Sequence, residues 1–103
     1  MPDRIEQLRT FIAASPDDPF ARYALALELK GKGEAEAAAE EMEELILRAP
    51  DYLAAYLQHG MLLQSLGKSE QARAAFRTGQ EVARRKGDSH TLSELTQALE
   101  SMG

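Results

Sequence analysis

The chain matches itself when it is shifted by 34 positions. Identical residues that coincide under this shift include Pro16 with Pro50, Asp17 with Asp51, Ala21 with Ala55, Gly33 with Gly67, Glu36 with Glu70, and Ala38 with Ala72. Similar apolar residues also coincide: Ala26 with Gly60, Leu27 with Met61, Leu29 with Leu63, and Met42 with Phe76. A fixed period in this range is typical of stacked helical units, each of which cannot bury its apolar face alone. The period therefore predicts a helical repeat protein.

Size and composition further limit the number of domains and the possible classes of protein. A length of 103 residues leaves room for one domain with a modest core. No apolar run is long enough to span a membrane, and the N-terminus lacks the basic flank and apolar stretch of a signal peptide. With no cysteine, disulfides and thiolate chemistry are excluded, and we expect a cytoplasmic protein. The net charge of −5 argues against a nucleic-acid partner, which usually requires a basic face.

Helix-start and helix-stop residues divide the chain into six expected helices. Asp3 and Asp18 suit the position before a helix, and Pro19 suits a first turn. We expect Asp51 and Ser69 to cap two later helices in the same way. Glycines and prolines at residues 16, 31–33, 50, 67 and 87 separate the helices. The expected helices cover about 3–15, 19–30, 34–48, 52–65, 69–85 and 89–102.

Each helix carries apolar residues at helical spacing, which predicts its buried side. Small residues at 26, 38, 60 and 72 should let paired helices approach closely, and larger residues at 29, 42, 63 and 76 should fill the space between pairs. The expected buried stripes of the first, third and last helices are Ile5, Leu8, Phe11 and Ile12; Ala35, Ala38, Ala39, Met42, Leu45 and Ile46; and Leu92, Leu95 and Leu99.

With these residues the chain resembles the tetratricopeptide repeat (TPR) family. The signature positions of the better-matching second unit are Tyr56, Gly60, Leu63, Gly67, Ala72 and Phe76; those of the first are Leu25, Ala26, Leu29, Gly33, Ala38, Leu45 and Pro50. The resemblance implies an all-α fold, a right-handed superhelical stack of antiparallel helix pairs with six helices. It also implies one domain over 1–103, divided into an N-terminal half-repeat helix (3–15), repeat 1 (17–50), repeat 2 (51–86) and a C-terminal capping helix (88–102).

The chain departs from the family pattern at several positions. His59 and Gly79 occupy slots that the family usually fills with Leu and Ala, and Arg84 stands where a proline would close the second unit, so the fifth helix should run longer than the third. We expect His59 to be neutral and hydrogen-bonded to a backbone carbonyl. The alternative is a histidine that titrates near neutral pH and loosens the helix packing.

Nothing in the sequence indicates catalysis. There is no cysteine, no cluster of residues with metal-ligand spacing and no glycine-rich loop after a strand, and the two histidines lie on different expected helices. We therefore expect a non-enzymatic protein with no cofactor and no metal.

Charge is unevenly distributed along the repeats. Residues 34–50 hold six glutamates and one arginine, whereas residues 67–87 hold six basic residues and two glutamates. Because these stretches occupy the same place in successive units, we expect Glu36, Glu40 or Glu44 to face Arg73 or Arg77 across the outer layer. Each such exposed pair would contribute about 0–1 kcal/mol. The alternative is that the glutamates attract a basic partner.

The basic cluster Arg84–Lys86 also has two interpretations. We expect a solvated helix C-terminus, where cations interact favourably with the helix dipole. The alternative is a contact with phosphate.

The resemblance places the functional surface on the first helix of each unit, which in the family lines a groove that holds a peptide. The eight residues expected to line it are Phe20, Tyr23, Leu27, Lys30, Ala54, Leu57, Met61 and Gln64. Spacings of three, four and seven residues put each set of four on one helix face, and that face is apolar and aromatic with a polar edge.

The predicted function is that of an adaptor or scaffold module that binds a protein or peptide partner in this groove. The family's clamp for an acidic C-terminus is not expected, because its slots hold Tyr23, Leu27 and Gln58. Two alternatives remain open. The chain could form a homodimer or larger homo-oligomer with the groove covered by itself, or it could be a fragment of a longer array.

Overall fold

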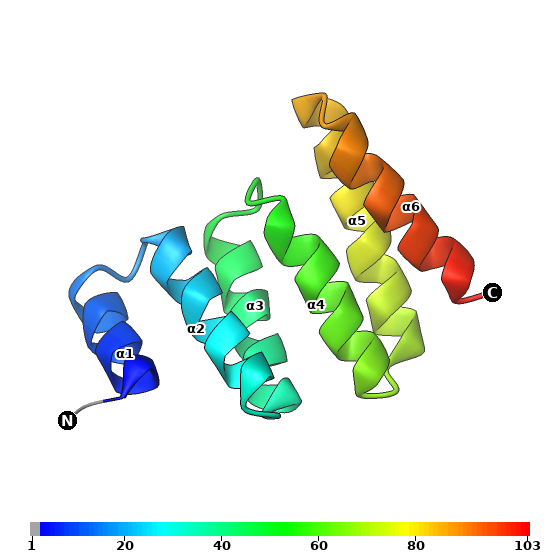
Figure 1. Ribbon diagram of the computed structural model, residues 1–103. Helices are drawn as coiled ribbons and strands as arrows, with labels where there is room; N and C mark the ends of the chain where they lie inside the picture. Colours follow the sequence, from blue (N-terminus) through cyan, green and yellow to red (C-terminus); the bar gives the residue numbers. More distant parts are fainter. Residues whose placement is uncertain (1–2) are drawn as a thin grey trace.

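The computed structural model describes residues 3–103, which form six α-helices and no strand (Figure 1). The helices are α1 (Arg4–Ala14), α2 (Pro19–Gly31), α3 (Ala35–Arg48), α4 (Ala54–Ser65), α5 (Ser69–Lys86) and α6 (Ser89–Ser101). Each boundary lies within two residues of the one expected from the sequence. The fifth helix is longer than the third, at 18 against 14 residues, as the absence of a closing proline predicts.

Successive helices pack side by side to form an elongated stack of 44 × 28 × 19 Å. α2 packs on α3 and α4 packs on α5 as antiparallel pairs, and α3 against α4 joins the two pairs. In Figure 1, α3 and α5 lie behind α2 and α4, and the two ends of the chain lie at opposite ends of the stack. α1 packs on α2 at one end, while α6 packs on α5 and touches α4 at the other. This arrangement is the superhelical stack of helix pairs that the resemblance implies.

Aspartate side chains start three of the helices. The Asp3 carboxylate accepts a hydrogen bond from the Glu6 N–H at 2.9 Å, and Asp18 accepts one from Phe20 N–H at the same distance. Asp88 does the same for Thr91 N–H, which lowers the pKa of Asp88 because the bond favours its charged form. The expectation that Asp3 and Asp18 are caps is therefore confirmed.

Two expected caps are wrong. α4 starts after Leu53 and α5 after Lys68, and neither start is held by a side-chain hydrogen bond. Asp51 instead lies three residues before α4, in the turn, where its carboxylate pairs with Arg85 at 3.3 Å. Ser69 is the first residue of α5 itself, one position too late to cap it.

Glycines at positive φ end α2 and α4 at equivalent places. Gly33 has φ 81° and Gly67 has φ 77°, a left-handed conformation that glycine adopts without steric cost. The residue after each glycine donates its N–H five residues back, Glu34 to the Leu29 carbonyl and Lys68 to the Leu63 carbonyl, both at 2.9 Å. These bonds satisfy carbonyls that the helix ends leave without partners.

The buried residues form two clusters, one for each helix pair. The first is built around Leu25, Leu29, Met42 and Leu45 between α2 and α3, and the second around Phe76, Val82 and Leu95 between α4, α5 and α6. Ile46 of α3 packs against both clusters. Together these contacts bury the apolar face of each pair against its neighbour.

The small residues act as the sequence predicts. Ala26, Ala38 and Ala72 are fully buried where helices cross. Gly60 is the closest approach, because a Cβ atom there would lie 2.3 Å from the ring of Phe76. The backbone of α4 therefore rests directly on an aromatic ring of α5.

A hydrogen bond from a helix side chain to a proline carbonyl recurs at equivalent positions of the two helix pairs, and we call this contact a joint. Arg22 donates from Nη2 to the Pro16 carbonyl at 3.3 Å, and Tyr56 donates from its hydroxyl to the Pro50 carbonyl at 2.6 Å. In each case the donor lies six residues after the proline and 34 residues from its counterpart. Different side chains thus link the first helix of each pair, α2 or α4, to the turn that precedes it.

Within the described residues, none of the helices combines the length and the apolar character needed to cross a membrane.

Candidate functional site

The eight residues expected to line a groove lie on two neighbouring helices, and we call this surface the α2–α4 face. Its members on α2 are Phe20, Tyr23, Leu27 and Lys30, and its members on α4 are Ala54, Leu57, Met61 and Gln64. Six of the eight side chains are exposed, while Tyr23 and Leu57 are half-buried. The three most apolar exposed members are Phe20 at 72%, Met61 at 42% and Leu27 at 37% exposure. Neither α1 nor α6 covers them.

Contacts across the α2–α4 face hold the two helices in register. Tyr52, in the turn before α4, forms an edge-to-face pair with Tyr23, with 5.4 Å between the ring centroids and 85° between the rings. The Phe20 ring is tilted by 56° to the Tyr52 ring at a centroid distance of 6.4 Å. Aromatic pairs of this kind contribute beyond simple burial. The part of the α2–α4 face near the start of α2 is therefore an aromatic cluster, supplied by α2 and by the turn before α4.

Polar groups fix the other end of the face. Lys30 Nζ donates to Gln58 Oε1 at 3.0 Å, which bridges α2 and α4. Burial raises the pKa of Tyr23, and the neighbouring Gln58 side chain acts in the opposite direction. Lys30 is thus already engaged by a neutral partner within the chain.

Shallow pockets extend the α2–α4 face at both ends. Towards α1, a pocket of about 370 Å³ lies between Leu8 and Phe11 of α1 and Phe20 and Ala24 of α2. Towards α6, a pocket of about 400 Å³ lies between Leu57 and Met61 and the polar side chains of Glu94, Gln97 and Ser101. One end of the surface is therefore aromatic, and the other combines apolar and polar side chains.

The expected buried position of Phe11 is wrong. Phe11 is 51% exposed, whereas Leu45, the residue aligned with it, is 1% exposed. Leu45 is enclosed because α3 packs on α2 and α4, but α1 packs closely only on α2 among the described residues. Phe11 consequently faces the pocket next to Phe20 and extends the apolar surface.

Sequence reasoning also missed Tyr52 as part of this surface, and it named Gln58 only as a slot of the acid-tail clamp. Tyr52 lies in a turn, so no helical periodicity assigns it a face. Gln58 had a detectable signal, because it follows Ala54 by four residues on α4 and therefore shares its side.

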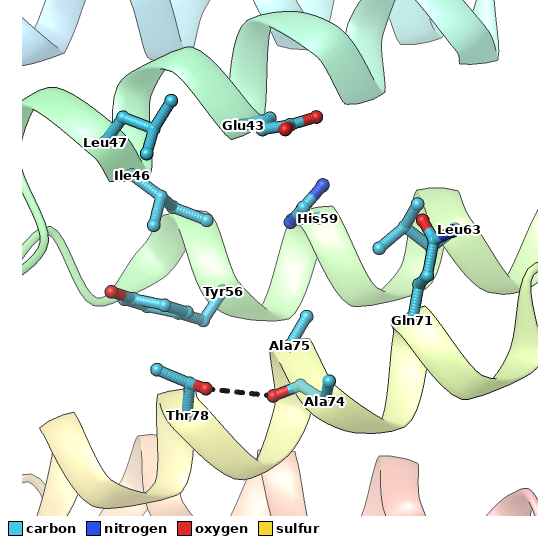
Figure 2. A pocket seen from close by; sticks show the side chains of 10 residues that line it. All are labelled: Glu43, Ile46, Leu47, Tyr56, His59, Leu63, Gln71, Ala74, Ala75 and Thr78. Carbon is cyan, nitrogen blue, oxygen red and sulfur yellow. Dashed lines mark hydrogen bonds between the residues drawn. The ribbon is translucent and has the colours of Figure 1, made fainter.

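A second hollow lies on the opposite layer, between α3 and α5 above α4. This convex pocket has a volume of about 330 Å³ and apolar walls, with Ile46 and Leu47 from α3 and Ala74 and Ala75 from α5 (Figure 2). Figure 2 shows His59 rising from α4 into the space that Glu43 borders.

His59 is half-buried and makes no hydrogen bond to any residue in 3–103, so the expected bond to a backbone carbonyl is wrong. Burial lowers the pKa of His59, because the apolar pocket disfavours the imidazolium, and Glu43 acts weakly in the opposite direction. Burial therefore favours the neutral form of His59.

The expected ion pairs between α3 and α5 do not form among the described residues. Glu44 instead pairs with Arg48 in its own helix, and Arg73 pairs with Glu70 in its own, both at 2.7 Å. No cation in residues 3–103 lies within 4 Å of Glu36, Glu40 or Glu43. Across the pocket α5 presents the uncharged residues Gln71, Ala74, Ala75 and Thr78 to α3, and not Arg73 or Arg77.

The basic end of α5 is engaged within the chain. Arg85 Nη1 lies 3.3 Å from Asp51 Oδ1, and Lys86 Nζ donates to the Asp51 carbonyl at 2.8 Å. These contacts fix the turn before α4 and leave Arg84 as the cluster member without such a bond. They favour the structural interpretation of this cluster over a phosphate site.

The described residues hold no group of three histidine, cysteine or acidic side chains arranged to bind a metal ion.

Known proteins share both the sequence pattern and the fold. The sequence model of the tetratricopeptide repeat family matches residues 2–103. The TPR repeat-containing protein PA0015 from Pseudomonas aeruginosa is 30% identical over 98 residues, which cover 95% of this chain and 93% of that protein.

Two solved structures are similar over most of their length. The tetratricopeptide repeat domain protein from Salinibacter ruber superimposes with a TM-score of 0.79 at 40% identity, covering 84% of this chain and 87% of the other. Protein BPP2914 from Bordetella parapertussis gives a TM-score of 0.82 at 26% identity, covering 98% and 88%. Proteins with this fold commonly mediate protein–protein interactions and are typically not enzymes. On the family match, the sequence relative and the shared helix stack, the chain belongs to the tetratricopeptide repeat family.

Proposed function

We propose that the chain is a non-enzymatic adaptor module that binds a peptide or helix of a partner protein on the α2–α4 face. The observation that carries the proposal is the row of exposed apolar side chains Phe20, Leu27 and Met61, which no helix of the stack covers. Large apolar side chains grouped on a face typically mark an interaction surface. The flanking pocket beside Phe11 offers a place for an anchor residue.

We further propose the division of the chain into repeats. Residues 17–50 and 51–86 would be the two full repeats, residues 3–15 a half-repeat helix and residues 88–102 a capping helix. The two separate clusters of buried residues support this division, because each cluster is centred on one helix pair.

Charge complementarity is weak on this face, so the partner segment should be mainly apolar. Lys30 is bound by Gln58, and the polar end near α6 holds Glu94 beside uncharged side chains. Two apolar residues of the segment could serve as anchors, one on Leu27 and one on Met61. Affinity should come from a few such anchors, since buried area alone is a poor guide to it.

Photo-crosslinking at chosen positions tests the proposal. A photoreactive amino acid at Leu27 or at Met61 should capture the same cellular partner, whereas one at Glu100, which is exposed on α6, should not. The captured partner is then purified and titrated against Leu27→Glu/Met61→Glu. Both side chains are exposed, so the variant should fold while weakening binding by at least about tenfold.

Three results would contradict the proposal. The partner could crosslink equally well from Glu100, it could bind the double glutamate variant with unchanged affinity, or the only captured molecule could be a second copy of the chain. The last result, accompanied by a doubled mass in sedimentation that the variant abolishes, would favour the homo-oligomer instead.

A further inference from the structure

We propose that the convex pocket is a second docking site, which takes a partner segment carrying a large apolar side chain flanked by lysines or arginines. The pocket lies on the layer opposite the α2–α4 face, so this inference does not depend on the function proposed for that face. It rests on the shape of the pocket, on the charges beside it and on the side chains that form its floor.

The interior of the convex pocket suits one apolar anchor. Its volume of about 330 Å³ is at the lower end of the range of roughly 300–1,000 Å³ that is typical of small-ligand sites. Ile46, Leu63 and the alanines of α5 supply the apolar surface, and Leu47 extends it outward with a side chain that is 72% exposed. A leucine, methionine or phenylalanine entering here would remove this surface from water.

An acidic stripe on α3 runs beside the convex pocket, and its member Glu43 also lines the pocket. Glu36, Glu40, Glu43 and Leu47 follow one another at spacings of four, three and four residues, so they form one exposed stripe on α3. None of the three glutamates pairs with a cation of the described chain, whereas Glu41 and Glu44 on other sides of α3 both do. The stripe thus presents three negative charges beside an apolar opening.

The opposite wall does not neutralise this charge. α5 lines the pocket with Gln71, Ala74, Ala75 and Thr78, all of which are uncharged. The Thr78 hydroxyl is already used by the Ala74 carbonyl at 3.0 Å, as the dashed line in Figure 2 shows. A basic occupant therefore meets attraction from α3 and no repulsion from the lining of α5, while an acidic one would be repelled.

His59 provides a polar group on the floor. Its ring nitrogens make no hydrogen bond within residues 3–103, and its side chain is directed into the pocket (Figure 2). A neutral imidazole offers one donor and one acceptor, which suits the backbone of an entering segment. A leucine in this slot would offer neither, so His59 distinguishes this pocket from a purely apolar hollow.

A set of synthetic peptides tests the inference. Each fluorescent ten-residue peptide has Leu, Met or Phe at its centre and either lysines, glutamates or serines on both sides, and binding to the full chain is followed by anisotropy at low salt. We expect the lysine-flanked peptides to bind and the glutamate-flanked ones to fail. Raising the salt concentration should weaken binding, because exposed charges are screened.

Variants locate the binding site. Glu40→Gln/Glu43→Gln changes only exposed side chains and should weaken binding at least about fivefold, whereas Glu100→Gln on α6 should leave it unchanged. Ala74→Leu keeps the charges but fills the pocket from α5, and it should weaken binding at least about tenfold. If Ala74→Leu fails to fold, the double glutamine variant still decides the question.

Several outcomes would overturn the inference. Peptide affinity could be independent of the flanking charge, or binding could be lost in Leu27→Glu/Met61→Glu and kept in the double glutamine variant, which would place the peptide on the α2–α4 face. Failure of every lysine-flanked peptide to bind at millimolar concentration would also overturn it. So would a doubled mass of the chain alone that Ala74→Leu abolishes, because the occupant would then be a second copy.

Discussion

At the scale of single residues, two glycines determine how closely the helices of the second pair approach. A Cβ atom at Gly60 would lie 2.3 Å from the Phe76 ring, and one at Gly79 would lie 2.7 Å from the Tyr56 Cβ. Glycine inside a helix costs about 1 kcal/mol relative to alanine. Glycine occupies both positions despite this cost because the neighbouring side chains fill the space that a methyl group would need. The departure from alanine at Gly79 is thus explained by packing against Tyr56 and Leu95.

We predict that Gly60→Ala lowers the free energy of unfolding by about 1–2 kcal/mol. Overpacking costs about 1–3 kcal/mol, and the gain in helix propensity offsets part of it. Urea denaturation followed by circular dichroism measures the change. Gly31→Ala is the matched control, because nothing lies within 4 Å of its Cβ position, and it should be neutral or stabilising. In a Phe76→Leu background the cost of Gly60→Ala should shrink, and an equal cost in both backgrounds would contradict the steric explanation.

His59 should make stability depend on pH. Its pKa in the folded chain is lowered, chiefly by burial, so the neutral ring is favoured by folding. This contribution is fully present above about pH 6.5, the ordinary value for histidine, and is lost as pH falls through the lower folded value. We therefore predict that the native chain loses more stability between pH 7 and pH 5 than His59→Leu does. Parallel urea titrations at pH 7, 6 and 5 measure the difference, and identical slopes would show that His59 does not contribute.

At the scale of helices and turns, two different side chains make the same kind of contact at equivalent positions of the two helix pairs. The carbonyls of Pro16 and Pro50 both accept a hydrogen bond from the residue six positions later, an arginine in one case and a tyrosine in the other. Arg22 also binds Glu41 of α3 at 3.0 Å, whereas Tyr56 has no such second bond. The first joint therefore links α2, α3 and the preceding turn, and it is the only place where a buried cation of the described chain does so.

We predict that Arg22→Ala lowers the free energy of unfolding by about 1.5–3 kcal/mol, the usual range for a hydrogen bond to a charged group. Arg22 is only 9% exposed, and its loss leaves the largely buried Glu41 carboxylate without its close partner. Arg48→Ala is the control, because Arg48 binds Pro16, Asp17 and Glu44 from an exposed position, and its loss should cost clearly less than the loss of Arg22. Arg22→Tyr copies the second joint and should fall between the two. Equal effects of the two alanine substitutions, measured by thermal and urea denaturation, would contradict this account.

At the scale of the whole molecule, the period predicts the order and pairing of the helices but not every distance between them. Helix ends follow from local chemistry, such as Asp18 before Pro19 and Gly33 at positive φ, and these are readable from the sequence. The separation of α3 and α5 depends on how two helix pairs tilt around α4. The sequence therefore predicted equivalent places for the glutamates and arginines, but it also predicted ion pairs between α3 and α5 that the described chain does not form.

The candidate surfaces were predictable to different degrees. Helical spacing correctly assigned Leu27 and Met61 to exposed positions, because solvent exposure on a helix follows directly from its periodicity. It placed Phe11 wrongly, since burial there depends on how many helices surround α1. Tyr52 was missed because a turn has no repeating face. The convex pocket could not be predicted, because a hollow is a property of packing between three helices and not of any one of them.

The proline carbonyls that anchor the joints have a consequence for how such a chain changes over generations. The acceptor belongs to the backbone, so no substitution of a side chain removes it, and only its donor is exposed to mutation. Arginine and tyrosine already serve as that donor in this one molecule. Copies of a duplicated segment can thus drift apart in sequence while their connection persists. Because the acceptor is a backbone carbonyl, the turn is also a suitable place for a designer to add or remove whole 34-residue segments.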